Sequence, residues 1–136
     1  MIKLKICGLR DATNALVAAD AGADFLGFVF VPGARRQLTL EWARAVIKEY
    51  RREWRKSEPQ LVGLFADQSM DDVNHTIEWC GLDLAQLCGD ESHEYWRSVV
   101  VPVIKHVRVP DQERRDQSIA DIRRRLEEIA CHGHMA

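Results

Sequence analysis

The sequence lacks the apolar run of roughly 20 residues that a membrane-spanning helix requires. Its first residues, MIKLKICG, are too short and too quickly interrupted to form a signal peptide. It also lacks an excess of either charge, and a net charge of −2 gives no reason to expect nucleic acid or a membrane surface as a partner. These absences predict a cytoplasmic protein with no nucleic-acid partner and no membrane partner.

Several short motifs that carry chemistry are also absent. The chain has no Walker loop, no GxGxxG run and no GxSxG nucleophile elbow. Its four cysteines form no CxxC pair and no zinc-ligand spacing: Cys7, Cys80, Cys88 and Cys131. The HGH at 132–134 lacks the third ligand that a zinc site needs. We therefore expect reduced thiols, of which three are small core residues, and no metal site.

No composition break or Pro/Gly/Ser-rich linker divides the chain, so residues 1–136 are expected to form a single domain. What the chain does have is a series of short apolar runs: 4–7, 25–30, 61–66, 82–88 and 101–109. These runs mostly lack the strict alternation of a half-exposed strand. Near-continuous apolar strands are typical of a parallel sheet that is covered by helices.

Helical patterns separate the apolar runs. The first spans 11–21 and is ended by Gly22. The next two begin after Thr39 and Ser69, and a weaker helical pattern covers 91–98. A last helix after Pro110 is predicted from an apolar repeat: Ile119, Ile122, Leu126 and Ile129. A sixth strand is expected to begin near Ile129.

Serial strand–helix units favour either a doubly wound sheet or a β/α barrel. A complete barrel needs about 200 residues or more. The 136 residues could therefore hold about the first five and a half units of a barrel, ending inside the sixth strand.

In both architectures the functional groups gather where strands end and helices begin. The residues at these positions form a mixed-charge rim suited to a small anionic metabolite: Cys7, Gly8, 31–37, Asp67, Gln68, 88–90 and Arg108. Cys7 precedes a helix start and lies near Lys5 and Arg10, which favours a thiolate that serves as base or nucleophile. The alternative is a buried cysteine that simply ends a strand.

Two other parts of this rim have alternative interpretations. Arg35 and Arg36 follow a Pro-Gly turn, which could aim a guanidinium at a carboxylate or phosphate, although exposed paired arginines are also common. Asp67 and Asp90 could be acids or helix caps, and we favour capping.

Taken together, these blocks resemble the phosphoribosylanthranilate isomerase family, whose fold is the (β/α)8 TIM barrel. The resemblance rests on KICGLRD, AGADFLGFVFVPGARRQL, LVGLFADQS, QLCGDES and PVIKHVRV, which occur in the family's order across essentially the whole chain. It identifies the chain as the N-terminal portion of such a barrel. It also implies an aldose–ketose type isomerase of tryptophan biosynthesis.

The family reaction is an Amadori rearrangement of N-(5-phosphoribosyl)anthranilate to 1-(2-carboxyphenylamino)-1-deoxyribulose 5-phosphate. It needs an acid for the ring oxygen and a base for the C2 proton. The resemblance assigns the catalytic base to Cys7 and recognition of the anthranilate carboxylate to Arg36. It implies a small phosphorylated substrate and no metal or organic cofactor.

Three departures from the family pattern matter. Cys88 replaces the histidine of QLHGDE, and Ala34, Arg35 and Gln37 replace the residues around the family's SPR arginine, which could loosen the loop. The family's general acid ends strand six and its phosphate loops follow strands seven and eight, so no residue here takes these roles. By itself the chain is therefore expected to be inactive. The alternative function is an incompetent half-barrel that associates with itself through its open sheet edge or pairs with a C-terminal fragment.

Overall fold

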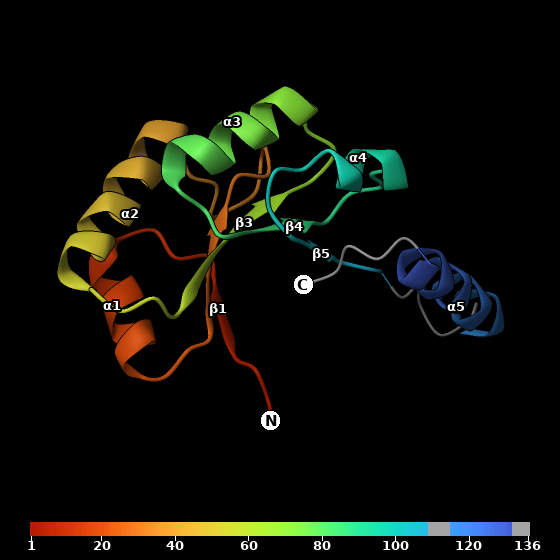
Figure 1. The fold of residues 1–136 in the computed structure, drawn as a ribbon, viewed down its shortest axis with the longest axis horizontal. Helices are drawn as coiled ribbons and strands as arrows, with labels where there is room; N and C mark the ends of the chain where they lie inside the picture. Colours follow the sequence, from red (N-terminus) through yellow and green to blue (C-terminus); the bar gives the residue numbers. More distant parts are fainter. Residues whose placement is uncertain (109–114, 132–136) are drawn as a thin grey trace.

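The computed structural model describes residues 1–108 and 115–131, in which strands and helices alternate along the chain (Figure 1). The strands are β1 (Lys5–Cys7), β2 (Phe25–Val29), β3 (Gln60–Phe65), β4 (Leu84–Leu87) and β5 (Val103–Lys105). The helices are α1 (Ala12–Asp20), α2 (Leu40–Glu53), α3 (Met70–Cys80), α4 (His93–Arg97) and α5 (Arg115–Cys131).

The five strands form one parallel sheet in the order β1-β2-β3-β4-β5. Their registers align the strand ends, since Cys7 pairs with Gly27 and Phe65 pairs with Leu87. Each strand therefore lies beside the next one in the chain, as a β/α barrel requires. The predicted α/β class and parallel sheet are confirmed.

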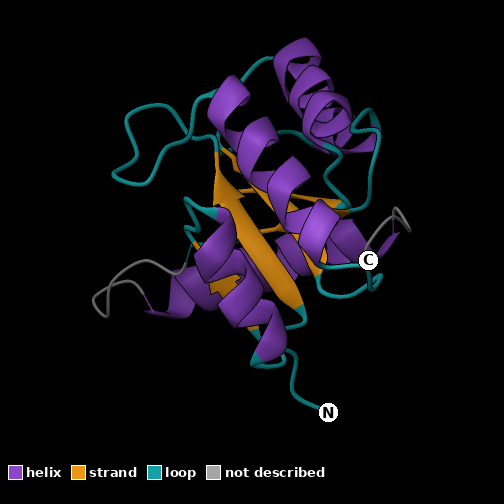
Figure 2. Ribbon diagram, turned by 90° about the vertical axis from the view of Figure 1, so that its left-hand side faces the viewer, coloured by secondary structure: helices purple, strands orange, loops and turns teal. Residues whose placement is uncertain are grey.

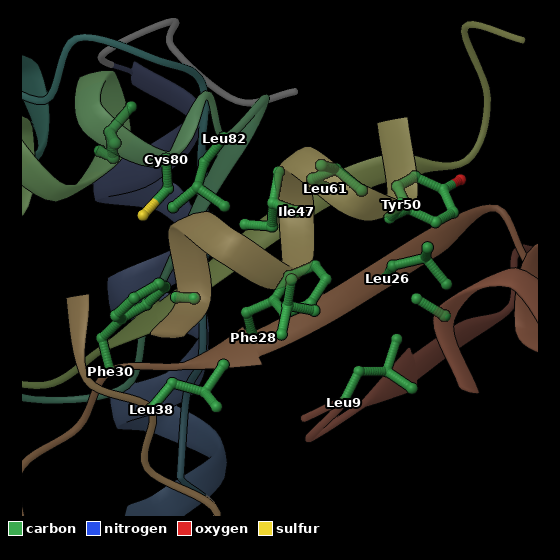
Figure 3. Packing of buried hydrophobic residues seen from close by; sticks show 14 of the residues in the cluster. Leu9, Leu26, Phe28, Phe30, Leu38, Ile47, Tyr50, Leu61, Cys80 and Leu82 are labelled. Carbon is green, nitrogen blue, oxygen red and sulfur yellow. The ribbon is translucent and has the colours of Figure 1, made fainter. Parts of the chain in front are cut away.

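Helices cover one face of the sheet (Figure 2), and the hydrophobic core lies between this helix layer and the sheet (Figure 3). Alternate strand residues, such as Leu26 and Phe28 of β2, are fully buried against this layer. On the helix side, Ile47 and Tyr50 of α2 are almost fully buried, as the apolar stripe of this helix predicts. The core therefore fixes α1, α2 and α3 on one face of the sheet (Figure 1).

Side-chain caps begin the first four helices. The carboxylate of Asp11 caps α1, and hydroxyl groups cap the next three helices through Thr39, Ser69 and Ser92. Each cap oxygen accepts a backbone N–H that has no partner inside its helix. The expected caps of α2 and α3 are confirmed, and Gly22 follows α1 with a φ of 90°.

Side chains also meet on the opposite, inner face of the sheet. The Lys5 ammonium on β1 donates a hydrogen bond to Oε1 of Gln86 on β4. With neighbouring strands about 4.8 Å apart, a flat sheet would hold these two strands about 14 Å apart. The contact across β2 and β3 therefore fits a sheet that curls, as part of a barrel does.

The last helix differs from expectation at its end. Helix α5 continues to Cys131, so the prediction of a strand beginning near Ile129 is wrong for residues 129–131. The rest of that expected strand, including the HGH at 132–134, lies outside the described residues. Ile119 and Leu126 of the predicted apolar stripe are 55% and 49% exposed, so this stripe is not covered by the sheet. Among the described residues no helix could span a membrane.

Candidate active site

The parallel sheet carries all the predicted rim residues to one end. Cys7 is the last residue of β1, Asp67 follows β3 by two residues, and Cys88 directly follows β4. The loop after β2 returns to the same end, because the Arg36 guanidinium donates to the Cys7 carbonyl oxygen. The expectation that these four residues share one end of the sheet is confirmed.

Cys7 lies half-buried on the inner face of β1, beside Gly27 of β2. A Cβ placed on Gly27 would lie 2.9 Å from Cys7 Sγ, so a glycine is needed beside the thiol. The Gly27 carbonyl oxygen accepts hydrogen bonds from Gly8 N (2.9 Å) and Leu9 N (3.1 Å). These two bonds fix the backbone just after Cys7. The position of the Cys7 thiol is therefore set both by the neighbouring Gly27 and by the fixed backbone that follows it.

The Arg36 side chain lies directly across Gly8. Its Nη1 is 3.2 Å from the Cys7 carbonyl oxygen, and a Cβ on Gly8 would lie 2.5 Å from Arg36 Cδ. Gly8 has a φ of 80°, so both its conformation and this close approach favour glycine. A guanidinium has five N–H donors, and one bond to Cys7 leaves the others for a carboxylate or phosphate.

The loop 31–37 is closed by its own hydrogen bonds. Gln37 Oε1 accepts from Gly33 N at 2.9 Å, and Leu38 N donates to the Val29 carbonyl oxygen at 2.8 Å. Gln37 thus ties the two ends of the turn that carries Arg36. Beside this loop lies a pocket of about 690 Å³, whose lining includes Arg10, Arg35 and Arg36.

Asp67 joins the ends of β3 and β4 rather than capping a helix. Its Oδ1 accepts from Asp90 N at 2.8 Å, while Ser69 and Ser92 cap the two nearby helices. The capping interpretation of Asp67 and Asp90 is therefore wrong. Asp67 has a φ of 54°, and a Cβ on Gly89 would lie 2.4 Å from its Cγ, so the two loops interlock tightly.

A buried ion pair completes this junction. Glu91 Oε2 lies 2.6 Å from Lys105 Nζ, and the two side chains are 2% and 5% exposed. Glu91 Oε1 also accepts from Asp67 N at 3.0 Å and from Gly89 N at 3.2 Å. Lys105 Nζ donates in addition to the Gly89 carbonyl oxygen. The carboxylate thereby links the loops after β3 and β4 to strand β5.

Burial alone would raise the pKa of Glu91. The ammonium of Lys105 and the backbone N–H donors outweigh that effect, so the pKa lies below its usual range.

Next to this junction, the Tyr95 hydroxyl donates to the Gln68 carbonyl oxygen at 2.9 Å. Burial, and then the nearby carboxylates, raise the pKa of Tyr95, so it remains a donor at neutral pH.

The family model for N-(5'-phosphoribosyl)anthranilate isomerase matches residues 4–128, which is most of the chain. The chain belongs to this family. The Pelobacter propionicus isomerase is 42% identical over 112 residues, which cover 82% of this chain and 51% of the relative. The Dehalococcoides mccartyi isomerase is 40% identical over 129 residues, which cover 95% of this chain and 58% of the relative.

Solved phosphoribosylanthranilate isomerases have the same fold over the shared region. The Thermotoga maritima structure is 30% identical with a TM-score of 0.77, covering 91% of this chain and 58% of that one. The Thermus thermophilus structure is 35% identical with a TM-score of 0.70, covering 83% and 56%. The chain thus spans between half and three fifths of the length of these relatives, as a portion of the isomerase barrel.

Within the family fold, sequence reasoning missed the ion pair of Glu91 and Lys105. A signal was present, because Lys105 interrupts the apolar run VPVIKHV, and a charge in a buried strand needs a partner.

The cysteine thiols lie in different surroundings. Burial raises the pKa of Cys80 in α3 to about 11, whereas Cys88 lies half-buried at the rim. Among the side chains that the structure describes, no group of three or more His, Cys, Asp or Glu could hold a metal.

The Glu91 pair generates a prediction about stability and pH. Glu91→Gln should lower the free energy of unfolding at pH 7 by about 3 kcal/mol, because it leaves Lys105 buried without its counter-charge. The pKa of Glu91 is lower in the folded state than in the unfolded state, so its contribution to the free energy of unfolding is complete above the unfolded pKa of about 4.3. This contribution is lost as the pH falls through the folded pKa. Urea unfolding of both proteins between pH 3 and pH 7 measures this difference.

Glu94→Gln is the matched control, because Glu94 is exposed on α4 and should change stability by less than about 0.5 kcal/mol. Adding Lys105→Met to Glu91→Gln should recover part of the loss. Equal losses for Glu91→Gln and Glu94→Gln at every pH would contradict a stabilising buried pair.

Proposed function

We propose that this chain is the N-terminal part of a phosphoribosylanthranilate isomerase. The proposed reaction is the Amadori rearrangement of N-(5-phosphoribosyl)anthranilate to 1-(2-carboxyphenylamino)-1-deoxyribulose 5-phosphate. The observation that carries the proposal is the placement of the Arg36 guanidinium against the Cys7 carbonyl. A guanidinium and a thiol thereby lie at one rim of a family barrel, which supports the roles proposed below for Arg36 and Cys7.

In the proposed reaction Cys7 is the base. Opening of the ribose ring, with protonation of the ring oxygen, gives a protonated Schiff base, and the Cys7 thiolate takes the proton from its C2. The C2–H electron pair forms the C1=C2 bond, and the C=N pair moves onto nitrogen, which gives an enol. Protonation at C1 and loss of the enol proton then give the ketone. The base must lie within hydrogen-bond reach of C2, which suits a side chain fixed on the inner face.

Arg36 would bind the anthranilate carboxylate. The hydrogen bond to Cys7 orients the guanidinium, and the closed loop 31–37 limits its motion. A guanidinium binds a carboxylate through two parallel hydrogen bonds, which fix both the position and the plane of the ligand. Binding at Arg36 would therefore place the substrate next to Cys7. A solved isomerase in complex with the reduced form of the product supports a phosphorylated ligand for the family.

The remaining roles belong to the part of the barrel that this chain does not align with. By resemblance, the general acid ends strand six and the phosphate loops follow strands seven and eight. The chain aligns with 58% of the D. mccartyi isomerase, so the rest of that relative can supply the missing strands.

The first functional prediction concerns Cys7. The 136-residue chain alone should give no turnover of N-(5-phosphoribosyl)anthranilate. Fusion to the remaining C-terminal part of the D. mccartyi isomerase should restore it. Cys7→Ala in the fusion protein should lower kcat by at least about 100-fold, because general base catalysis contributes about that much or more. Chromatographic measurement of product over time gives the rates.

Cys80→Ala is the matched control, because Cys80 is a buried thiol in α3, away from the rim. It should leave kcat within a few-fold of the unsubstituted fusion protein. Turnover by the chain alone at the rate of the fusion protein would show that the strand-six acid is not needed. An unchanged kcat in Cys7→Ala would remove Cys7 as the base.

The second functional prediction concerns Arg36. In the fusion protein, Arg36→Met should raise KM by about 10- to 100-fold, because it removes charge-assisted hydrogen bonds to the substrate carboxylate. The value of kcat should change far less, since such binding is shared by ground state and transition state. Arg52→Met is the control, since the Arg52 guanidinium pairs only with the neighbouring surface residue Glu53 among the described contacts. A KM that does not change in Arg36→Met refutes the assignment.

A second candidate function is self-association, and the exposed apolar surface favours it. Helix α5 exposes Ile119 and Leu126, and β1 exposes Ile6 beside a pocket lined partly by Val17. The strands β1 and β5 each leave one edge unpaired within the described sheet. Open edges and apolar faces promote pairing with another chain.

This second candidate predicts that the purified chain sediments as a dimer or larger species at micromolar concentration. Combining Ile119→Glu with Leu126→Glu should shift it toward the monomer, because it places charge on the apolar stripe. Ala120→Glu adds charge at another exposed position of α5 and should have less effect. A monomer at every concentration would exclude self-association as the function of the chain.

A further inference from the structure

Three side chains form a hydrogen-bonded array across the inner face of the sheet. The Lys5 ammonium on β1 donates to Gln86 Oε1 on β4. Nε2 of Gln86 lies 3.5 Å from Cys88 Sγ and donates to it. All three residues are half-buried. The array therefore links the strand that carries Cys7 to the cysteine that stands at the family's histidine position.

The contact between Lys5 and Gln86 determines the direction of the hydrogen bond between Gln86 and Cys88. An ammonium has three donors and no acceptor, so it can bond only to the oxygen of the Gln86 amide. The amide nitrogen must then point away from Lys5, toward Cys88. Cys88 Sγ is consequently the acceptor in this contact, which leaves its S–H free to act as a donor.

The backbone around Cys88 leaves the side chain little other freedom. Cys88 N donates to the Phe65 carbonyl oxygen at 2.8 Å, which continues the ladder between β3 and β4. The next residue, Gly89, is fixed through its N–H to Glu91 and its close contact with Asp67. Only the χ1 angle of Cys88 remains to be set, and the bond from Gln86 favours one of its rotamers.

We propose that Lys5 and Gln86 are positioning residues that direct the Cys88 thiol into the mouth of the barrel, where it donates a hydrogen bond to the substrate. The array itself is independent of the reaction, whereas the substrate contact rests on the proposed isomerase function. Cys88 is thereby a polar group of the site in its own right, in place of the histidine of QLHGDE. Lys5 acts on Cys88 only through the Gln86 amide.

The array is tested by the side-chain amide resonance of Gln86 in the ¹⁵N-labelled 136-residue chain. Gln86→Met identifies this resonance by its loss. Lys5→Met and Cys88→Ala should each shift it, since each removes one partner of the amide. Lys5→Arg keeps a donor at the same place and should restore most of the original shift. The Gln68 amide, which donates to the Phe30 carbonyl oxygen, is the internal reference and should stay in place.

The substrate contact is tested by kinetics in the fusion protein. Gln86→Met should raise KM about fivefold, the effect of one neutral hydrogen bond, while kcat changes less. Gln60→Met, at the exposed start of β3, is the matched control and should leave KM unchanged.

The outcomes separate the two proposals. A Gln86 amide that responds to neither Lys5→Met nor Cys88→Ala overturns the array. If the Gln86 amide resonance shifts in Lys5→Met and Cys88→Ala but KM is unchanged in Gln86→Met, the substrate contact is overturned. Responsive resonances in a fusion protein that never turns over the substrate support the array and refute the isomerase function.

Discussion

The parallel direction of the five strands is the constraint on which the rest of this structure depends. Because every strand runs the same way, every loop that follows a strand opens at the same end. Residues far apart in the chain, such as Cys7 and Cys88, therefore lie at the same rim of the sheet. The helices need only cover the outer face, and their caps at Asp11, Thr39 and Ser69 begin them just beyond that rim.

The two halves of the rim are held by different physical means. The first half is held by close approach, since Gly27 and Gly8 let the Cys7 thiol and the Arg36 chain lie against backbone. The second half is held by charge, since the buried Glu91 carboxylate collects donors from two loops and from Lys105. Desolvation makes that carboxylate costly unless every donor is in place, so the loops after β3 and β4 are coupled to β5.

The sequence was sufficient for the strand order, the caps of α2 and α3, and the family, because these depend on local patterns and on ordered blocks. It was not sufficient for the role of Asp67. An aspartate before a helix gives the same sequence pattern whether its carboxylate caps that helix or accepts a hydrogen bond from another loop, as Asp67 does from Asp90 N. The array of Lys5 and Gln86 depends on curvature, which no local pattern reports. The stripe of α5 predicted a helix correctly, but periodicity alone does not say what covers the exposed Ile119 and Leu126.

The contact between Lys5 and Gln86 also bears on how such half-barrels can be recombined. It lies on the inner face, where alternate strands of a complete barrel send side chains into each layer. A second half that closes on this one must leave room for the Lys5 and Gln86 side chains. Family membership alone does not ensure that two halves fit, because the volume left beside one lysine decides which partners can close the barrel.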